Sequence, residues 1–292
     1  MHYQIAHTTT YTYDQPVILQ PHVLRLRPRC DGGQHLDHLL LEVVPEPAGV
    51  TQVIDAEGNA IARFWWSETM TRALSFHVTS EVETYCTNPF NYLLESWATH
   101  LPIDYPASLL STLQPYLSDC LRPSVSGIDP IAAQLGQEIA QAMAGNTVAF
   151  LTELNQRIYQ TCAYQLRETG EPLPPGITWT EKSGSCRDLT VLFMAACRAV
   201  GLAARFVSGY QEGDPGAQTW YLHAWAEVYL PGAGWRGYDP TLGLVVSDRH
   251  VALVASAWPR NAAPVSGTLQ GKGAQSVINY HLSIQRGSEV RA

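Results

Sequence analysis

Residues 184–201, Gly-Ser-Cys-Arg-Asp-Leu-Thr-Val-Leu-Phe-Met-Ala-Ala-Cys-Arg-Ala-Val-Gly, predict one buried helix that carries a cysteine in its first turn. Apolar residues recur at the three- and four-residue spacing of a buried helix face, at Leu189, Leu192, Phe193, Ala196 and Val200. Ser185 is a typical N-terminal cap, and Gly201 suits the residue that ends a helix. Cys186 is therefore expected where backbone N–H groups lack partners and the helix dipole is positive, which favours thiolate over thiol.

A strand that lies 37 residues further on supplies a proton partner for this cysteine. Residues 221–230 alternate, with His223 on the face opposite to Leu222, Ala224, Ala226, Val228 and Leu230. Residues 231–234 predict a turn, and residues 235–239 predict the returning strand, which brings Asp239 nearly opposite His223. A cysteine at a helix start, a histidine on a strand and an acid on its neighbour form a nucleophile, base and orienter set.

Four motifs resemble the core of the bacterial transglutaminase-like superfamily in order and spacing: residues 184–188, 203–210, 223–228 and 238–241. This resemblance implies a papain-like core whose Cys-His-Asp triad falls on Cys186, His223 and Asp239. Residues 3–11 and 24–28 resemble the β-rich N-terminal region that is often joined to that core. Residues 248–251 match a segment that usually follows the core, whereas residues 253–261 depart from the usual Gly-Arg-Asp-Tyr-like sequence there.

The pattern along the chain predicts an α+β protein with a β-rich, sandwich-like N-terminal domain over residues 1–86. Its expected strands are separated by turn signals such as Asp14-Gln15-Pro16, and they cover residues 3–13, 23–26, 38–44, 52–54, 61–66 and 74–84. Residues 87–128, which are rich in proline, predict an ordered connector. Over residues 129–292 the resemblance implies the papain-like, transglutaminase-like core. The pattern there predicts helices over residues 131–143 and 147–161 and a C-terminal strand at 276–284.

Other residues are candidates for shaping the site. The backbone N–H of Cys186 is the natural first donor to an oxyanion, and a side chain from Trp179 or Thr180 is a candidate second donor. Trp225 and Trp235 lie on the hairpin that carries the triad and are candidates for walling an acyl pocket; packing explains both equally well. The glycine-containing loop at residues 212–216 is a candidate lid.

Composition narrows the class of function. The chain has 46% apolar and 15% charged residues, and its net charge of −8 with no basic cluster argues against nucleic-acid or anionic-membrane surfaces. No export signal or membrane span is visible, so a cytoplasmic location is expected. Six cysteines without a C-x-x-C pair are expected to be free thiols, and nothing in the triad requires a metal or cofactor.

The sequence therefore predicts a cysteine-dependent acyl enzyme, with a peptidase- or amidase-type hydrolase favoured over acyl transfer. Its expected partner is a peptide, a protein or a small amide. Acyl transfer to an amine stays open, either as in a protein-glutamine transglutaminase or as in the arylamine acetyltransferase-like variant of this core. A third alternative is a non-catalytic binding module that retains the fold.

Overall fold

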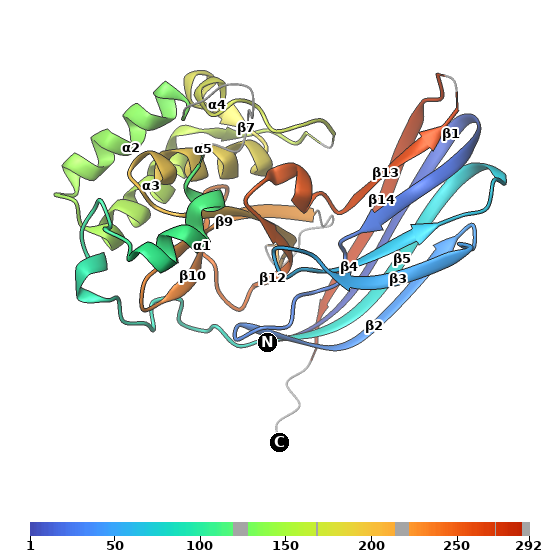
Figure 1. Ribbon diagram of the computed structural model, residues 1–292, viewed down its shortest axis with the longest axis horizontal. Coiled ribbons are helices and arrows are strands. Elements are labelled where there is room, and N and C mark those ends of the chain that lie inside the picture. Colours follow the sequence, from blue (N-terminus) through green and yellow to red (C-terminus); the bar gives the residue numbers. More distant parts are fainter. Residues whose placement is uncertain (119–127, 168, 214–221, 272, 288–292) are drawn as a thin grey trace.

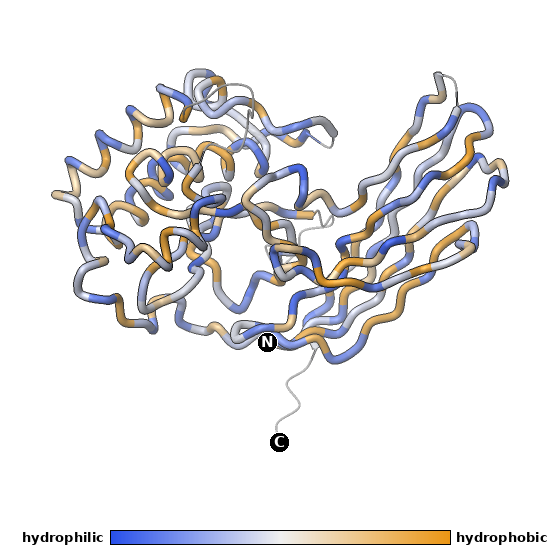
Figure 2. Tube along the Cα trace, in the orientation of Figure 1, coloured by the Kyte–Doolittle hydropathy of each residue, from blue (hydrophilic) through white to orange (hydrophobic). Residues whose placement is uncertain are grey.

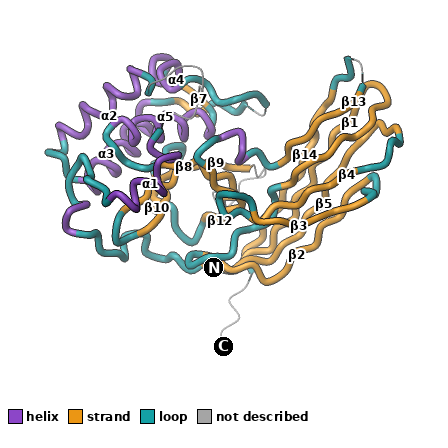
Figure 3. The backbone as a smooth tube through the Cα atoms, viewed as in Figure 1, coloured by secondary structure: helices purple, strands orange, loops and turns teal. Residues whose placement is uncertain are grey.

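The computed structural model describes residues 1–118, 128–167, 169–213, 222–271 and 273–287. A helix-rich part packs beside a group of long strands that extends away from it (Figures 1 and 3). The α+β class that the sequence predicts is confirmed. The loop proposed as a lid falls partly on residues 214–221, which lie outside the described ranges, as do residues 119–127 of the connector.

The N-terminal part is an antiparallel sheet whose main order is β2-β5-β1-β4-β3. Its strands are β1 (His2–Leu24), β2 (Gln34–Val44), β3 (Gly49–Ile54), β4 (Ala60–Trp65) and β5 (Met70–Thr84). Hydrophobic and polar residues alternate along these strands (Figure 2), as expected where one face is covered. The turn that we predicted at residues 14–16 is wrong, because β1 continues through it. A register shift against β5 between Thr12 and Val17 accommodates Pro16 as a bulge.

The two last strands, β13 (Val265–Gln270) and β14 (Ser276–Arg286), return to this sheet and pair with β1. The domain boundaries stay a prediction, but the C-terminal strand that we assigned to the core lies instead in the N-terminal sheet. The reason is that β1 has a free edge opposite β5 along residues 3–13, and β14 occupies that edge. The two ends of the chain thus build one layer.

The core joins helices to a second antiparallel sheet of order β11-β10-β9-β8-β12. The strands are β8 (Ala204–Gln211), β9 (Leu222–Leu230), β10 (Gly234–Asp239), β11 (Leu244–Val245) and β12 (His250–Ser256). The helices are α2 (Pro130–Ala142), α3 (Thr147–Thr161), α4 (Pro175–Glu181) and α5 (Cys186–Ala199). A short pair, β6 (Ala163–Tyr164) and β7 (Ser183–Gly184), precedes α5, and the 3-10 turn η2 (Pro259–Ala262) follows β12.

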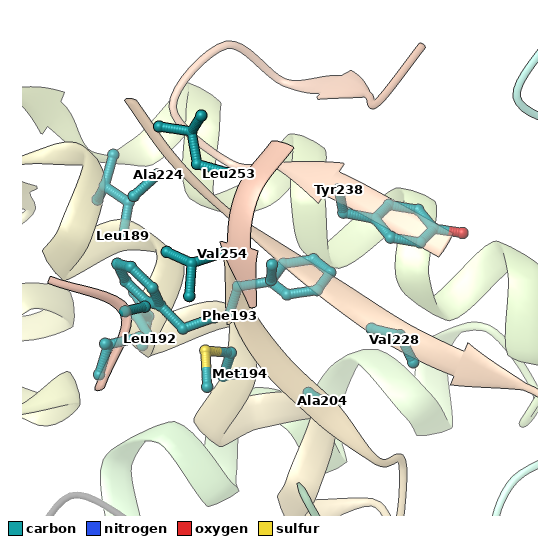
Figure 4. Close-up of a cluster of buried hydrophobic side chains, with 14 of the residues drawn as sticks. Leu189, Leu192, Phe193, Met194, Ala204, Ala224, Val228, Tyr238, Leu253 and Val254 are labelled. Carbon is teal, nitrogen blue, oxygen red and sulfur yellow. The ribbon is translucent and has the colours of Figure 1, made fainter. Parts of the chain in front are cut away.

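Helix α5 is the centre of this core. The sequence predicted one buried face, but every residue from Asp188 to Arg198 is buried, because α2, α3 and α4 cover the sides that β8 and β9 leave. Figure 4 shows α5 side chains meeting those of the sheet, and the rings of Phe193 and Tyr238 stack with centroids 5.6 Å apart. Gly201 ends the helix region with a φ of 81°, as its position predicted.

The connector is ordered where it is described, and it packs along the core. It contains the 3-10 turn η1 (Ser96–Ala98) and helix α1 (Ala107–Leu117). The Thr147 hydroxyl donates to the carbonyl of Ala98 at 2.8 Å, and the ring of Tyr116 meets that of Trp235 at 4.9 Å. The connector therefore packs against the β9–β10 hairpin.

We expect Gly209→Ala to destabilise the protein. A Cβ at Gly209 in β8 would lie 2.3 Å from the Trp225 ring and 2.3 Å from the Val251 carbonyl oxygen. Overpacking of this kind costs about 1–3 kcal/mol, so the urea midpoint should fall clearly. The control is Gly32→Ala, where a Cβ meets nothing within 4 Å. Equal midpoints for the two variants would contradict the close packing described here.

Candidate active site

Cys186 begins helix α5, directly after its N-terminal cap Ser185. The cysteine is partly buried, and its backbone N–H belongs to the first turn, which has no acceptor within the helix. Strand β7 leads into this turn and pairs with β6. The pairing of β6 with β7 therefore fixes the segment that leads into α5. The Cys186 sulfur lies at the positive end of the helix dipole, as the sequence predicted.

Asp188 ties the helix start to the loop that precedes it. One carboxylate oxygen accepts from the backbone N–H of Ser185 at 2.8 Å and from its hydroxyl at 2.7 Å. The other accepts from the backbone N–H of Leu173 at 2.7 Å and pairs with the Arg167 guanidinium. Burial alone would raise the pKa of Asp188, but these hydrogen bonds hold it below its ordinary value. The position of Cys186 is thus fixed by a buried anion.

His223 and Asp239 lie on the neighbouring strands β9 and β10. Tyr238 pairs with Ala226, so Asp239 is diagonal to His223 on the same face. The Nε2 of His223 lies 2.7 Å from the Asp239 carboxylate, whose side chain is fully buried. The backbone N–H of Thr241 donates to the second carboxylate oxygen at 3.0 Å. The hairpin geometry expected from the sequence therefore places the acid against the imidazole.

The charge state of His223 follows from its neighbours. Burial would lower its pKa, but the Asp239 carboxylate and hydrogen bonds to Asp239 and Cys186 raise it to about 10. Asp239 has its pKa lowered, despite burial, by the same imidazole and by His250. Because Nε2 faces Asp239, Nδ1 is the ring nitrogen left for the Cys186 sulfur. His223 thus has a hydrogen bond to Asp239, and both Asp239 and Cys186 raise its pKa.

A second histidine, His250 at the start of β12, reaches the same carboxylate oxygen. Its Nε2 lies 3.2 Å from Asp239, and 1% of its side chain is exposed. Burial lowers the pKa of His250, so the neutral ring donates through Nε2. The sequence motif at residues 248–251 contained this residue, but no periodicity in it signalled a role.

A cleft of about 220 Å³ opens beside Cys186 and His223. One wall comes from the core, including Tyr164, Leu166 and Leu222, and the other comes from the N-terminal sheet, through β1 and β14. The sequence did not predict the second wall. None of the described residues that line this cleft is an aspartate or a glutamate.

The candidates for a second oxyanion donor do not line this cleft. Trp179 and Thr180 lie on helix α4, where the Lys182 ammonium sits 3.4 Å from the centre of the Trp179 ring. The Thr180 hydroxyl donates to the carbonyl of Gly176 at 2.7 Å, so its proton is already used within the helix. The Thr180 hydroxyl is therefore occupied within α4, and the indole N–H of Trp179 as a second oxyanion donor stays a prediction.

Trp225 and Trp235 do not wall an acyl pocket either. Both line a separate cavity of about 570 Å³, together with Cys86 and His250. Trp225 is fully buried, and its ring centre lies 6.3 Å from that of His223 and 5.3 Å from that of His250. Although Trp225 shares a face with His223, it lies two residues further along β9 and does not line the cleft beside Cys186. We therefore correct its role, and that of Trp235, to packing behind the triad.

Several general features accompany the site. The cysteines within the described ranges are free, whereas Cys120 falls outside them. In the part of the chain that the structure describes, no three His, Cys, Asp or Glu side chains converge to hold a metal ion. Over the same residues, no helix combines the length and the apolar character needed to cross a bilayer.

Comparison with known proteins matches both parts of the chain. Residues 3–83 fit the bacterial transglutaminase-like N-terminal region, and residues 133–240 fit the transglutaminase-like superfamily. The second match contains Cys186, His223 and Asp239. Residues 133–240 are a transglutaminase-like superfamily domain. The resemblance seen in the sequence is thereby confirmed, and the superfamily indicates a cysteine-dependent enzyme.

Relatives of this transglutaminase-like protein extend over the whole chain. An uncharacterized protein of Mycobacterium tuberculosis is 27% identical over 97% of this chain and 92% of its own length. A protein-glutamine gamma-glutamyltransferase of Pseudomonas aeruginosa is 33% identical, over 39% of this chain and 18% of its own length. The crystal structure of a candidate cysteine protease from Cytophaga hutchinsonii superposes with a TM-score of 0.72, at 20% identity, covering 100% of this chain and 92% of that one. The chain therefore shares its fold with that structure, and the cysteine-enzyme part of the fold is the region over residues 133–240.

Proposed function

We propose that this transglutaminase-like protein is a cysteine hydrolase that cleaves an amide or peptide bond through a thioester intermediate. The observation that carries the proposal is the hydrogen bond between His223 and the buried Asp239, beside a cleft that Cys186 and His223 both line. A histidine whose pKa is raised to about 10 is an imidazolium at neutral pH, and it stabilises a neighbouring thiolate. The three residues act as nucleophile, general acid and base, and orienter.

The reaction proceeds in two steps, acylation of Cys186 and hydrolysis of the thioester. The Cys186 sulfur attacks the carbonyl carbon, and a C–S bond forms while the carbonyl oxygen becomes an oxyanion near the Cys186 backbone N–H. His223 gives its proton to the leaving nitrogen as the C–N bond breaks, which leaves the thioester and a free amine. Water then gives a proton to His223 and attacks the thioester. The C–S bond breaks, the carboxylic acid leaves and the thiolate returns.

Water is favoured as the acceptor because of the charges around the cleft. A lysine amine that attacks the thioester approaches as an ammonium, and a carboxylate in the cleft would assist its binding. No carboxylate is found among the described residues that line the cleft, and Arg167 and Arg187 add positive charge there. Acyl transfer is therefore the weaker candidate. We propose a peptide, protein or small amide as partner and a cytoplasmic location.

An acylation experiment tests the proposed function. Reaction with p-nitrophenyl acetate should add one acetyl group to Cys186, seen as an intact-mass increase that decays as water hydrolyses the thioester. Added cadaverine should leave that decay rate unchanged within about twofold, because the cleft favours no amine. Decay that accelerates with cadaverine, together with acetylated cadaverine as product, would establish a transferase. If no acetyl group is found on Cys186, the binding-module alternative holds.

We also propose that His250 is a positioning residue that acts on His223 through Asp239. His250 shares the carboxylate oxygen that His223 uses, and its hydrogen bond helps to lower the Asp239 pKa. It touches no part of the cleft beside Cys186. Its role is therefore to keep Asp239 ionised and oriented.

We expect His250→Leu to slow the alkylation of Cys186 by about tenfold, the effect of losing one hydrogen bond to a buried charge. Because His250 holds the Asp239 pKa down, its loss should also move the acid limb of the rate profile towards neutral pH. His250→Gln, which keeps an N–H donor, should restore part of the rate. A uniform loss of rate with an unchanged acid limb in both variants would indicate only a packing role.

A further inference from the structure

The wall of the cleft that faces Cys186 from the N-terminal sheet is built by paired residues. Thr9 of β1 lies opposite Tyr280 of β14, and Tyr11 lies opposite Ile278. Directly paired residues, and residues two apart along a strand, point to the same face of a sheet. All four side chains line the cleft. We call this set of four the paired patch.

His7 fixes the paired patch relative to the core. Its Nδ1 lies 2.9 Å from the hydroxyl of Tyr210 on β8, and its Nε2 lies 3.0 Å from the hydroxyl of Thr9. Burial lowers the pKa of His7 to about 4, so the ring is neutral under ordinary conditions, with one donor and one acceptor nitrogen. Because both nitrogens are used, the sheet is bonded to the core at the edge of the cleft, and the patch has a fixed place beside Cys186.

The chemistry of the walls selects an uncharged group. Apart from the Cys186–His223 pair, the charged side chains that line the cleft are Arg167 and Arg187. Arg167 pairs with Asp188, and Arg187 donates to the backbone carbonyls of Gly170 and Arg167. Opposite the paired patch, Tyr164 and Leu166 are about half exposed. Because aromatic and aliphatic surface lies on both sides of the cleft, an apolar side chain buried there contributes most to the free energy of binding.

The size of the cleft limits what it holds. Its volume of about 220 Å³ is smaller than that of sites for drug-sized ligands, which hold about 300–1,000 Å³. One side chain attached to the reacting carbonyl fits this space better than an extended chain. An aromatic ring suits it particularly, because Tyr11 and Tyr280 present ring surface.

We infer that the N-terminal sheet provides the subsite for the acyl side of the substrate, and that this subsite selects an apolar, preferably aromatic, side chain next to the scissile carbonyl. The inference rests on the proposed function, since it assumes that an acyl group forms on Cys186. It makes the N-terminal domain a specificity-determining part of the enzyme.

Chloromethyl ketones of single amino acids test this subsite. Their acyl part mimics the substrate, and the sulfur displaces chloride, forming a C–S bond as the C–Cl bond breaks. We expect the acetyl-phenylalanyl reagent to alkylate Cys186 at least about tenfold faster than the glycyl reagent, and the lysyl reagent to show no such advantage. The Phe/Gly rate ratio should fall towards one in Ile278→Asp and be reduced in Ile278→Ala. Each ratio is measured within one variant, so a change in overall reactivity does not affect it.

The matched control is Val277→Asp, on the same strand but with its side chain on the opposite face and exposed to solvent. It should keep the native ratio. Equal rates for the phenylalanyl and glycyl reagents, or a faster lysyl reagent, would overturn the subsite. If iodoacetamide still labelled Cys186 rapidly in that case, the assignment of Cys186 as nucleophile would stand. Slow labelling by every reagent, iodoacetamide included, would overturn the proposed function itself.

Discussion

Cys186→Ala is expected to abolish formation of the acyl-enzyme and to lower turnover of any amide or ester substrate by about 10³-fold or more. The reason is that the thioester forms on this sulfur, and removal of a nucleophile that works in a triad eliminates most of the catalytic advantage. Alanine also suits the first turn of a helix, so the fold should be retained. The measurement is intact mass after p-nitrophenyl acetate treatment, together with steady-state hydrolysis.

Cys86→Ala is the control for this variant. Cys86 is also partly exposed, but it lines the separate cavity behind the triad, and burial raises the pKa of its thiol. It should acylate and turn over as the native protein does. Comparable loss in both variants would mean that the loss came from damage to the fold, and full activity of Cys186→Ala would refute the assignment of the nucleophile.

Asp239→Asn is expected to lower the rate at neutral pH by about 10³–10⁴-fold, as loss of the orienting acid does in serine triads. In the native protein, Asp239 raises the His223 pKa against the opposing effect of burial. Without the carboxylate, only the effect of Cys186 opposes burial, so the His223 pKa should fall from about 10 back towards its ordinary value of 6.5. The imidazole is then neutral at neutral pH, and residual alkylation of Cys186 should rise only where an isolated thiol ionises.

The same substitution makes a prediction about stability. A histidine whose pKa is raised by folding adds its full contribution to the free energy of unfolding below its pKa in the unfolded chain, about 6.5. That contribution is lost as the pH rises through the folded-state pKa of about 10. The free energy of unfolding should therefore differ most between native protein and Asp239→Asn from about pH 4 to about pH 6.5, and the difference should shrink as the pH rises towards 10. Glu227→Gln, which breaks the ion pair between Glu227 of β9 and Arg205 of β8, should leave the rate profile in place. A difference for Asp239→Asn that does not vary with pH would contradict the ion pair.

The parts that the sequence predicted well are those governed by local rules. Helix α5, its cap at Ser185 and its end before Gly201 follow from short-range spacing. The β9–β10 hairpin places Asp239 against His223 because two strands joined by a short turn have few possible registers. Local periodicity thus located the candidate triad.

The features that were missed depend on contacts between distant residues. The pairing of β14 with β1 joins segments more than 260 residues apart, and no local pattern in either strand specifies its partner. The N-terminal wall of the cleft follows from that pairing, so it was missed as well. Trp225 was misplaced because alternation predicts only which face of a strand a side chain lies on. Which residues of that face lie next to Cys186 depends on how α5 packs against the strand, and that is a tertiary property. His250 reaches Asp239 from a strand beyond β8, which is equally non-local.

The rate of Cys186 alkylation by iodoacetamide as a function of pH tests the central claim most directly. Site-resolved mass spectrometry would follow Cys186 alongside N-acetylcysteine in the same solution, from about pH 5 to about pH 9, a range that spans the ionisation of a free thiol near pH 8.5. A sulfur paired with the His223 imidazolium should react rapidly at about pH 6, where the reference thiol is almost fully protonated. If Cys186 instead reacts only in parallel with the reference, the thiolate–imidazolium pair is absent and this is not a working cysteine hydrolase.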